Sequence, residues 1–391
     1  MLDAKTIERL NETLKTSIDR QEIAGANLMI IRGGAEQYYH EDGLADREAG
    51  TPIRRDSIFR LYSMTKPVTA TAVMLLLERG AIDLFDPVGR YLPGFRNQQV
   101  AKDGELVPTE RDMTLYDLLN MTSGLVYGGP GEPGRQTEAL FREIDERLLG
   151  DSPLGTVEAM NRLGECPLAF QPGASWQYGT SADVLAAVVE VVGGMSFGEF
   201  LRRELFEPLG MTDTGFWLPG AKRGRLAKTY AADGPEGLEL YEGNHLGIVH
   251  QMDREPAFQS GGAGLVSTID DAARFTTMLL REGSLDGVRL LRPATVRYMT
   301  SSKLTLRQRQ AFSGWHTLRG HGYGNQMRIM TDSRKAGILG SDGEYGWDGW
   351  LGAYFCNSPQ DDLTFLFMTQ RKDAGTLPIT RKLRNIVFSS L

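Results

Sequence analysis

The stretch Ser63-Met64-Thr65-Lys66 decides how this chain of 391 residues is interpreted. It places a lysine three residues after a serine, where a run of apolar helix formers begins at 66–78. Residues three apart lie side by side on one helix face, so the amine would sit beside the hydroxyl. A serine hydroxyl needs such a base, and the dipole at a helix start favours the negative charge that develops there. The motif therefore predicts an activated serine, although about one such tetrapeptide is expected by chance in a chain this long.

The order of the predicted elements is strands, then helices, then strands. The early elements are an amphipathic helix at 4–22 and a hairpin of 27–32 with 36–40 around two glycines. Strand signals return late in the chain at 264–267, 354–356 and 363–369, with helices at 269–282 and 378–390. We therefore expect an α/β domain formed by residues 1–80 and 241–391.

The middle of the chain, residues 81–240, is predicted to form a mainly helical domain. Its helical patches lie at 115–121, 136–149, 181–192 and 197–206. The glycine- and proline-rich stretch 128–134 is predicted to be an irregular loop. We expect the active site in the cleft between the two domains.

Composition and charge exclude several classes of protein. The 41% hydrophobic and 24% charged residues are typical of a globular protein, and the net charge of −7 is interspersed. Neither a basic nucleic-acid face nor a polybasic membrane patch is indicated, and no apolar run approaches the roughly 20 residues that span a bilayer. The N-terminus lacks the apolar segment of a signal peptide, and the distant Cys166 and Cys356 are predicted to be reduced core residues, so we expect a cytoplasmic location.

Cofactor and metal motifs are not evident in the sequence. The histidine pairs 245/250 and 316/321 are five residues apart and lack the spacing of a zinc-binding helix. No glycine-rich nucleotide loop stands between a predicted strand and a helix. We therefore expect neither a metal nor a cofactor.

Three further stretches support the Ser-x-x-Lys motif. They are Tyr178-Gly179-Thr180 after Gln171-Pro172-Gly173, the segment LLNMTSGL at 118–125 and the segment GGAGLVST at 261–268. Together they resemble the serine β-lactamase and penicillin-binding-protein superfamily, and most of all its class C-like esterases, the family VIII carboxylesterases. The resemblance covers nearly the whole chain. It implies an α/β (α+β) fold of the β-lactamase/transpeptidase type, with an antiparallel sheet flanked by helices and a helical inserted domain.

The resemblance also implies catalytic roles. Ser63 would be the acylated nucleophile, and Lys66 and Tyr178 would share the proton transfers. A tyrosine pKa near 10 is too high for a base at neutral pH, but a neighbouring ammonium favours the phenolate, and burial favours the neutral amine. Which group takes the serine proton is therefore open at this point. Tyr127 and Thr180 are expected to contact substrate.

The third motif of the family departs from the β-lactamase pattern. Trp347-Asp348-Gly349 stands where β-lactamases carry Lys-(Thr/Ser)-Gly, the element that recognises a carboxylate. An indole offers one N–H and no charge, but it presents a flat apolar face. We therefore expect Trp347, Gly349 and Trp350 to bind an uncharged acyl or alcohol group. The resemblance also assigns the oxyanion hole to the backbone N–H groups of Ser63 and Trp350.

Two competing motifs are rejected. Gly194-x-Ser196-x-Gly198 fits the nucleophile elbow of α/β-hydrolases, but the preceding segment is predicted to be helical, and Ser196 with Glu199 forms a helix-capping pattern. Tyr323-Gly324-Asn325 duplicates the tyrosine motif, yet it lies close to Trp347 rather than in the helical insertion. We predict that it is a glycine-rich turn.

The resulting hypothesis is a serine carboxylesterase that hydrolyses short-chain esters through an acyl-enzyme on Ser63. The same site would also suit a β-lactamase, a D-amino-acid amidase or peptidase, or an acyltransferase. A binding module without catalysis is disfavoured because Ser63, Lys66 and Tyr178 are all present. The expected partner is a small-molecule ester; the natural substrate and the oligomeric state stay open.

Overall fold

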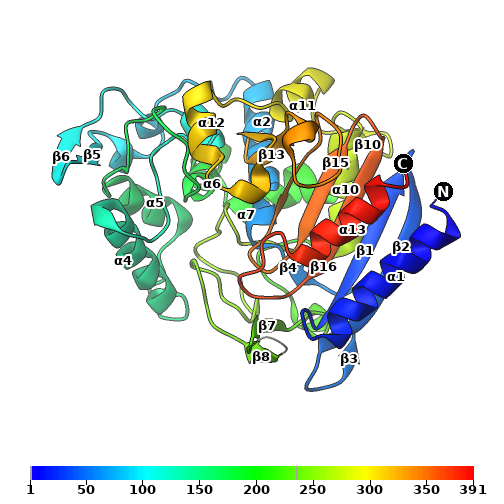
Figure 1. Ribbon diagram of the computed structural model, residues 1–391. Coiled ribbons are helices and arrows are strands. Elements are labelled where there is room, and N and C mark those ends of the chain that lie inside the picture. Colours follow the sequence, from blue (N-terminus) through cyan, green and yellow to red (C-terminus); the bar gives the residue numbers. More distant parts are fainter. Residues whose placement is uncertain (1, 235–236) are drawn as a thin grey trace.

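The computed structural model describes residues 2–234 and 237–391 and is built on one large antiparallel sheet (Figure 1). The strand order is β12-β13-β14-β15-β16-β1-β2-β3. The bounds are β1 Gly25–Arg32, β2 Ala35–Asp46, β3 Thr51–Pro52, β12 His321–Gly324, β13 Met327–Met330, β14 Tyr345–Asp348, β15 Tyr354–Ser358 and β16 Leu363–Thr369. Because β1 pairs with β16, the two ends of the chain share one sheet.

Side chains alternate between the two faces of this sheet, as the two-residue period of a strand requires. On β1, Leu28 and Ile30 face a core formed with α1 (Ala4–Asp19) and α13 (Pro378–Phe388). Met29 and Ile31 face the larger core, which contains α2 (Lys66–Glu78) and α10 (Ile269–Leu280). Helices α1 and α13 lie side by side over the first face.

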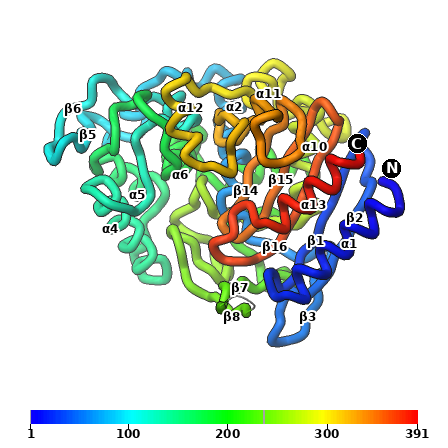
Figure 2. Tube along the Cα trace, in the orientation of Figure 1, coloured from blue at the N-terminus to red at the C-terminus, as the bar shows by residue number. Residues whose placement is uncertain are grey.

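Most of the helical part lies on the side of α2 that faces away from β1 and β2, as the cyan and green tube in Figure 2 shows. Its helices are α3 Leu115–Leu119, α4 Gly131–Arg147, α5 Thr156–Gly164, α6 Ser181–Gly193, α7 Phe197–Leu201, α8 Glu207–Leu209 and α9 Gly220–Arg223. Two hairpins accompany them, β5 (Gln99–Lys102) with β6 (Glu105–Pro108), and β7 (Thr229–Ala232) with β8 (Leu238–Tyr241). Residues 181–189 of α6 are all buried, and α6 packs against α2.

The remaining short strands and helices lie outside the large sheet. They are β4 Phe59–Arg60, β9 Val266–Ser267, β10 Ser284–Leu285, β11 Val288–Arg289, α11 Pro293–Met299 and α12 Leu306–Phe312. Helix α12 comes from the C-terminal half but lies against the helical part, where Gln308 Nε2 donates to the Gly173 carbonyl at 2.7 Å. Phe312 packs edge-on against Trp176 with ring centroids 4.8 Å apart.

Most of the predicted elements are confirmed: the first hairpin, the helices that begin near residues 4, 66, 181, 269 and 378, and the late strands at 354–358 and 363–369. Ser196 caps α7 by accepting a hydrogen bond from the Glu199 N–H at 3.3 Å. Cys166 and Cys356 are free and buried.

Two local predictions are wrong. The stretch 128–134 is not all loop, because α4 begins at Gly131, whose φ of +84° turns the chain, and Pro133 occupies the first helical turn, where its missing N–H costs little. Tyr323 lies in β12 rather than in a turn. The turn is formed by Asn325 and Gln326, whose φ values of +48° and +66° are typical of a tight hairpin.

Within the described ranges, no single helix is long and apolar enough to cross a bilayer, although the bent pair Ser181–Gly193 and Phe197–Leu209 meets the length and composition criteria together.

Candidate active site

Ser63 lies in a sharp bend between β4 and α2. The chain leaves β4, passes through a 3₁₀ turn at Tyr62–Thr65 and enters α2 at Lys66. Tyr62 has a φ of +45°, an unfavourable value for a residue with a side chain. The bend leaves Ser63 half-buried at the edge of a cavity while Lys66 is fully buried behind it.

The Lys66 amine has three hydrogen-bond partners. Nζ lies 3.0 Å from Ser63 Oγ, 3.1 Å from the Tyr127 hydroxyl and 2.8 Å from the Gly262 carbonyl. Burial lowers the pKa of Lys66 to about 7, and the charges of Asp183 and Asp348 oppose this only in part. A substantial fraction of the amine is therefore neutral at physiological pH.

Asp183 fixes the loop that contains Gly262. This carboxylate lies near the start of α6 and accepts hydrogen bonds from Ser260 Oγ at 2.6 Å and from the Gly262 N–H at 3.0 Å. The carbonyl of the same glycine accepts from Lys66. Asp183 therefore acts on Lys66 twice, through its charge and by positioning the carbonyl partner of the amine.

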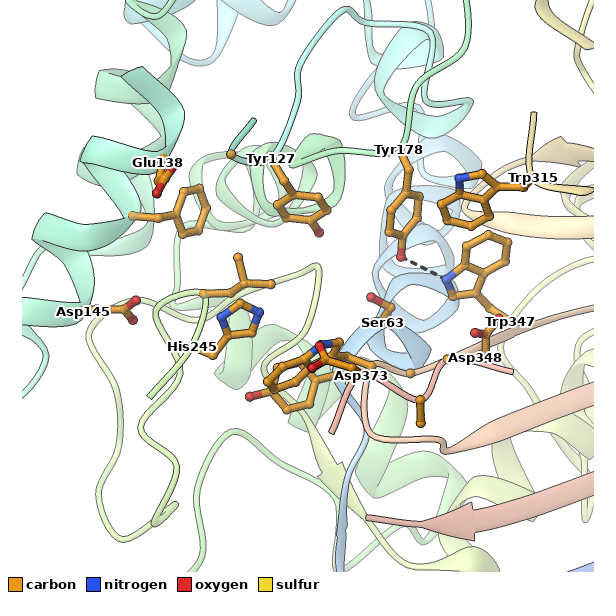
Figure 3. A pocket seen from close by; sticks show the side chains of 18 of the residues that line it. Ser63, Tyr127, Glu138, Asp145, Tyr178, His245, Trp315, Trp347, Asp348 and Asp373 are labelled. Atoms are coloured by element: carbon orange, nitrogen blue, oxygen red, sulfur yellow. Dashed lines mark hydrogen bonds between the residues drawn. The ribbon is translucent and has the colours of Figure 1, made fainter. Parts of the chain in front are cut away.

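Tyr178 directs its hydroxyl toward Ser63 (Figure 3). Its hydroxyl accepts a hydrogen bond from Trp347 Nε1 at 3.0 Å, and its ring centroid lies 4.7 Å from Lys66 Nζ. Burial raises the pKa of Tyr178, although hydrogen bonds with Ser63 and Trp347 lower it in part. Tyr178 is therefore a neutral phenol at physiological pH, able to donate a proton.

The end of β14 approaches the backbone before the serine very closely. A Cβ on Gly349 would lie 2.1 Å from the Leu61 carbonyl oxygen, so only glycine fits there. Gly352 N–H bonds to the Gly349 carbonyl at 2.9 Å and closes a tight turn that contains Trp350. Within the described residues, the backbone N–H groups of Ser63 and Trp350 have no protein acceptor. Both donors belong to segments that this close approach brings together.

The cavity in front of Ser63 has a volume of about 830 Å³. On one side Trp315, Tyr178 and Trp347 form an aromatic wall, with the Tyr178 ring centroid 5.4 Å from each indole. On the other side the Trp350 ring packs against His245 at 4.3 Å, and its Nε1 donates to Asp373 at 2.7 Å. Aromatic faces therefore bound both sides of the serine.

The structure brings together most of the residues that the sequence singled out. Ser63, Tyr127, Tyr178, Trp347, Gly349 and Trp350 line the cavity, and Lys66 lies directly behind Ser63. Thr180 does not line it. Its side chain is fully buried at the start of α6 and directed to the Val126 carbonyl, so the prediction that Thr180 contacts substrate is not supported.

Several lining residues were not singled out from the sequence as binding residues. Trp315 follows α12, Asp145 lies on α4, and His245 lies in a loop whose histidines were weighed above only as metal ligands. No local motif marks these positions, because they reach the cavity only through the packing of distant segments. Asp183 was only weakly indicated as a functional residue, because acidic residues are common at helix starts for electrostatic reasons alone.

The sequence matches the family model described as Beta-lactamase over residues 6–386. The chain belongs to the β-lactamase family. It is 33% identical to Esterase EstB of Burkholderia gladioli over 99% of this chain and 97% of that protein. It is also 33% identical to Protein Rv1367c of Mycobacterium tuberculosis, over 92% of this chain and 88% of that protein.

Solved structures confirm the expected fold. EstCE1, described as a hydrolase with promiscuous acyltransferase activity, matches with a TM-score of 0.83 at 27% identity and covers 98% of both chains. The β-lactamase/transpeptidase-like fold with its large antiparallel sheet is therefore established for this chain, which is a serine hydrolase of the β-lactamase family.

The close contact between Gly349 and Leu61 predicts that a larger residue at position 349 disturbs the oxyanion hole. Gly349→Ala should push the turn that contains Trp350 away from Ser63, because the new methyl group clashes with backbone. We expect labelling of Ser63 by a fluorophosphonate to slow by at least about tenfold, since each oxyanion donor typically contributes a factor of 10²–10³. The rate is measured by intact-protein mass spectrometry.

Gly337→Ala is the matched control, because a Cβ at Gly337 meets no atom within 4 Å. This variant should label at the rate of the unmodified protein. Unchanged labelling of Gly349→Ala would show that the turn does not contribute to the reactivity of Ser63.

Proposed function

We propose that this protein is a carboxylesterase that cleaves short-chain esters through an acyl-enzyme on Ser63. The observation that carries the proposal is the contact between Trp347 and Tyr178. The indole N–H of Trp347 is already bonded to the Tyr178 hydroxyl, so the third motif offers no free donor or charge to a substrate carboxylate. A penicillin or a peptide C-terminus would lose the partner that a lysine supplies there. The similarity to Esterase EstB supports the same conclusion.

Lys66 is the proposed general base. In its neutral form it can donate N–H groups to the Gly262 carbonyl and the Tyr127 hydroxyl, which leaves the lone pair for the Ser63 proton. Ser63 Oγ then bonds to the ester carbon, and its proton passes to Lys66 Nζ. Negative charge on the carbonyl oxygen is stabilised by the backbone N–H groups of Ser63 and Trp350.

Tyr178 is the proposed proton donor to the leaving alcohol. Because its pKa is raised by burial, it holds its proton until alkoxide develops, and it recovers a proton from the Lys66 ammonium. After the alcohol leaves, water attacks the acyl-enzyme, its proton returns through the same pair, and the carboxylic acid is released. Lys66 already contacts Tyr127 and Gly262 in the structure, so the amine is in position for these steps.

Acyl transfer is a second candidate function. An alcohol or amine bound against the aromatic walls could replace water in the second step. The observation that favours it is the similarity to EstCE1, which is described as having promiscuous acyltransferase activity. The ratio of ester to free acid formed in the presence of an added alcohol distinguishes the two reactions.

The proposal predicts that Ser63→Ala lowers hydrolysis of p-nitrophenyl butyrate by at least about 10³-fold, as loss of a nucleophile does in other serine hydrolases. Release of p-nitrophenol measures the rate. Ser196→Ala, which changes the serine of the rejected motif, should retain full activity. We also expect a much lower kcat/KM for the cephalosporin nitrocefin than for the ester. Retained esterase activity in Ser63→Ala, or more efficient nitrocefin cleavage, would contradict the proposal.

The pKa of Lys66 predicts the pH dependence of the reaction. Because the base must be neutral and its pKa is about 7, kcat/KM should rise with pH below that value and level off above it. The rise should be roughly tenfold per pH unit on the acidic side. A profile that keeps rising toward pH 10 would instead indicate a phenolate or an unshifted lysine as the base.

Lys66→Arg should be inactive at every pH, since a guanidinium does not lose its proton.

A further inference from the structure

The active-site cavity extends from Ser63 toward α4, and its charged side chains are mostly acidic (Figure 3). Its lining includes the carboxylates of Glu138, Asp145, Asp348 and Asp373 and one guanidinium, that of Arg142.

Three of the four carboxylates are paired with cations. Glu138 lies 3.5 Å from Arg142, so this exposed pair leaves no net charge. Asp348 lies 3.2 Å from the buried Arg328, and Asp373 lies 3.3 Å from Lys372. These groups already have partners within the protein.

Asp145 is different. It accepts a hydrogen bond from the Gly247 N–H at 2.8 Å, and no lysine, arginine or histidine in the described ranges forms an ion pair with it. Burial raises the pKa of Asp145, as expected for a carboxylate that has lost solvent without gaining a cation. A positively charged ligand in the cavity would compensate this carboxylate.

The Tyr62 hydroxyl is a second, independent indication of a ligand. Tyr62 lines the same cavity and is 1% exposed, and within the described residues its hydroxyl has no hydrogen-bond partner. The lone pairs of its oxygen are therefore unused and can face the positive charge of a ligand. Tyr62 and Asp145 both line this cavity, so a single ligand can lie near both groups.

His245 completes this side of the cavity and lies between Asp145 and Ser63 in Figure 3. Its ring packs on Trp350 and Tyr62, with centroid distances of 4.3 and 6.2 Å. Burial lowers the pKa of His245, so it is neutral at physiological pH and does not repel a cation. The faces of the aromatic rings beside it attract an ammonium group through cation–π interactions.

We propose that Asp145 and Tyr62 form a subsite for an alkylammonium group, and that the preferred substrates are esters whose acyl or alcohol part carries such a cation. The inference rests on the proposed esterase function and names its substrate class. The ester lies at Ser63, and the ammonium points toward α4. Anionic esters are disfavoured because they would meet the uncompensated charge of Asp145.

The test compares two ligands of nearly the same shape, butyrylcholine and 3,3-dimethylbutyl butyrate, which differ in the positive charge. Their binding to Ser63→Ala is measured by isothermal titration calorimetry, so that no turnover occurs. We expect butyrylcholine to bind about tenfold or more tightly, as expected for a unit charge near a carboxylate in a partly desolvated site. Adding Asp145→Asn should abolish this preference. Adding Asp151→Asn, which neutralises an exposed aspartate outside the cavity lining, should preserve it.

Equal affinity for the two ligands, no detectable binding of butyrylcholine, or an unchanged preference after Asp145→Asn would each overturn the subsite. Turnover by the protein with Ser63 intact separates this from the esterase proposal. A charge preference without hydrolysis of either ester would retain the subsite and remove the proposed function. Hydrolysis of p-nitrophenyl butyrate without a charge preference would do the reverse.

Discussion

The site depends on one buried amine. Lys66 is held between the Ser63 hydroxyl, the Tyr127 hydroxyl and the Gly262 carbonyl, and burial alone accounts for its lowered pKa. In water this amine would be an ammonium and could not take a proton from serine. The apolar helix α2 is the physical cause, because it carries Lys66 into the core. Asp183 limits the shift and holds the carbonyl partner in place.

The second constraint is the close approach of β14 to the segment before Ser63. Gly349 permits it, and the neighbouring tryptophans then determine what the cavity can bind. The indole N–H of Trp347 donates to Tyr178, so Trp347 presents only its aromatic face to the ligand. The indole N–H of Trp350 donates to Asp373. Where a β-lactamase places a cation for a carboxylate, this chain places aromatic surface and, farther along the cavity, the uncompensated carboxylate of Asp145. These two features together are the basis of the proposed preference for uncharged and cationic substrates.

Sequence patterns predicted β1, β2, β15, β16 and most helices, because each of these carries a local signal, but they did not predict β12, β13 or β14. The strand pattern predicted β1 and β16, the Ser-x-x-Lys spacing indicated Ser63, and the family resemblance indicated Tyr178. Side-chain direction was not accessible in this way, so Thr180 was assigned to the cavity although its hydroxyl points to Val126. Asp145 and Trp315 were missed because they reach the cavity only through the packing of α4 and of the segment after α12. The start of α4 at Gly131, which has a positive φ, was missed because the surrounding glycines and prolines are typical of a loop.

The most direct test of this account is a titration of the Lys66 amine itself. Selective ¹⁵N labelling of lysine side chains, with Lys66→Arg to assign the signal, allows its protonation to be followed by NMR in the unmodified protein. The account predicts a midpoint near pH 7, at which the chemical shift of Lys66 Nζ changes while those of exposed lysines do not. A midpoint near the ordinary lysine value of about 10.4 would contradict it, because Ser63 would then lack a neutral base at physiological pH.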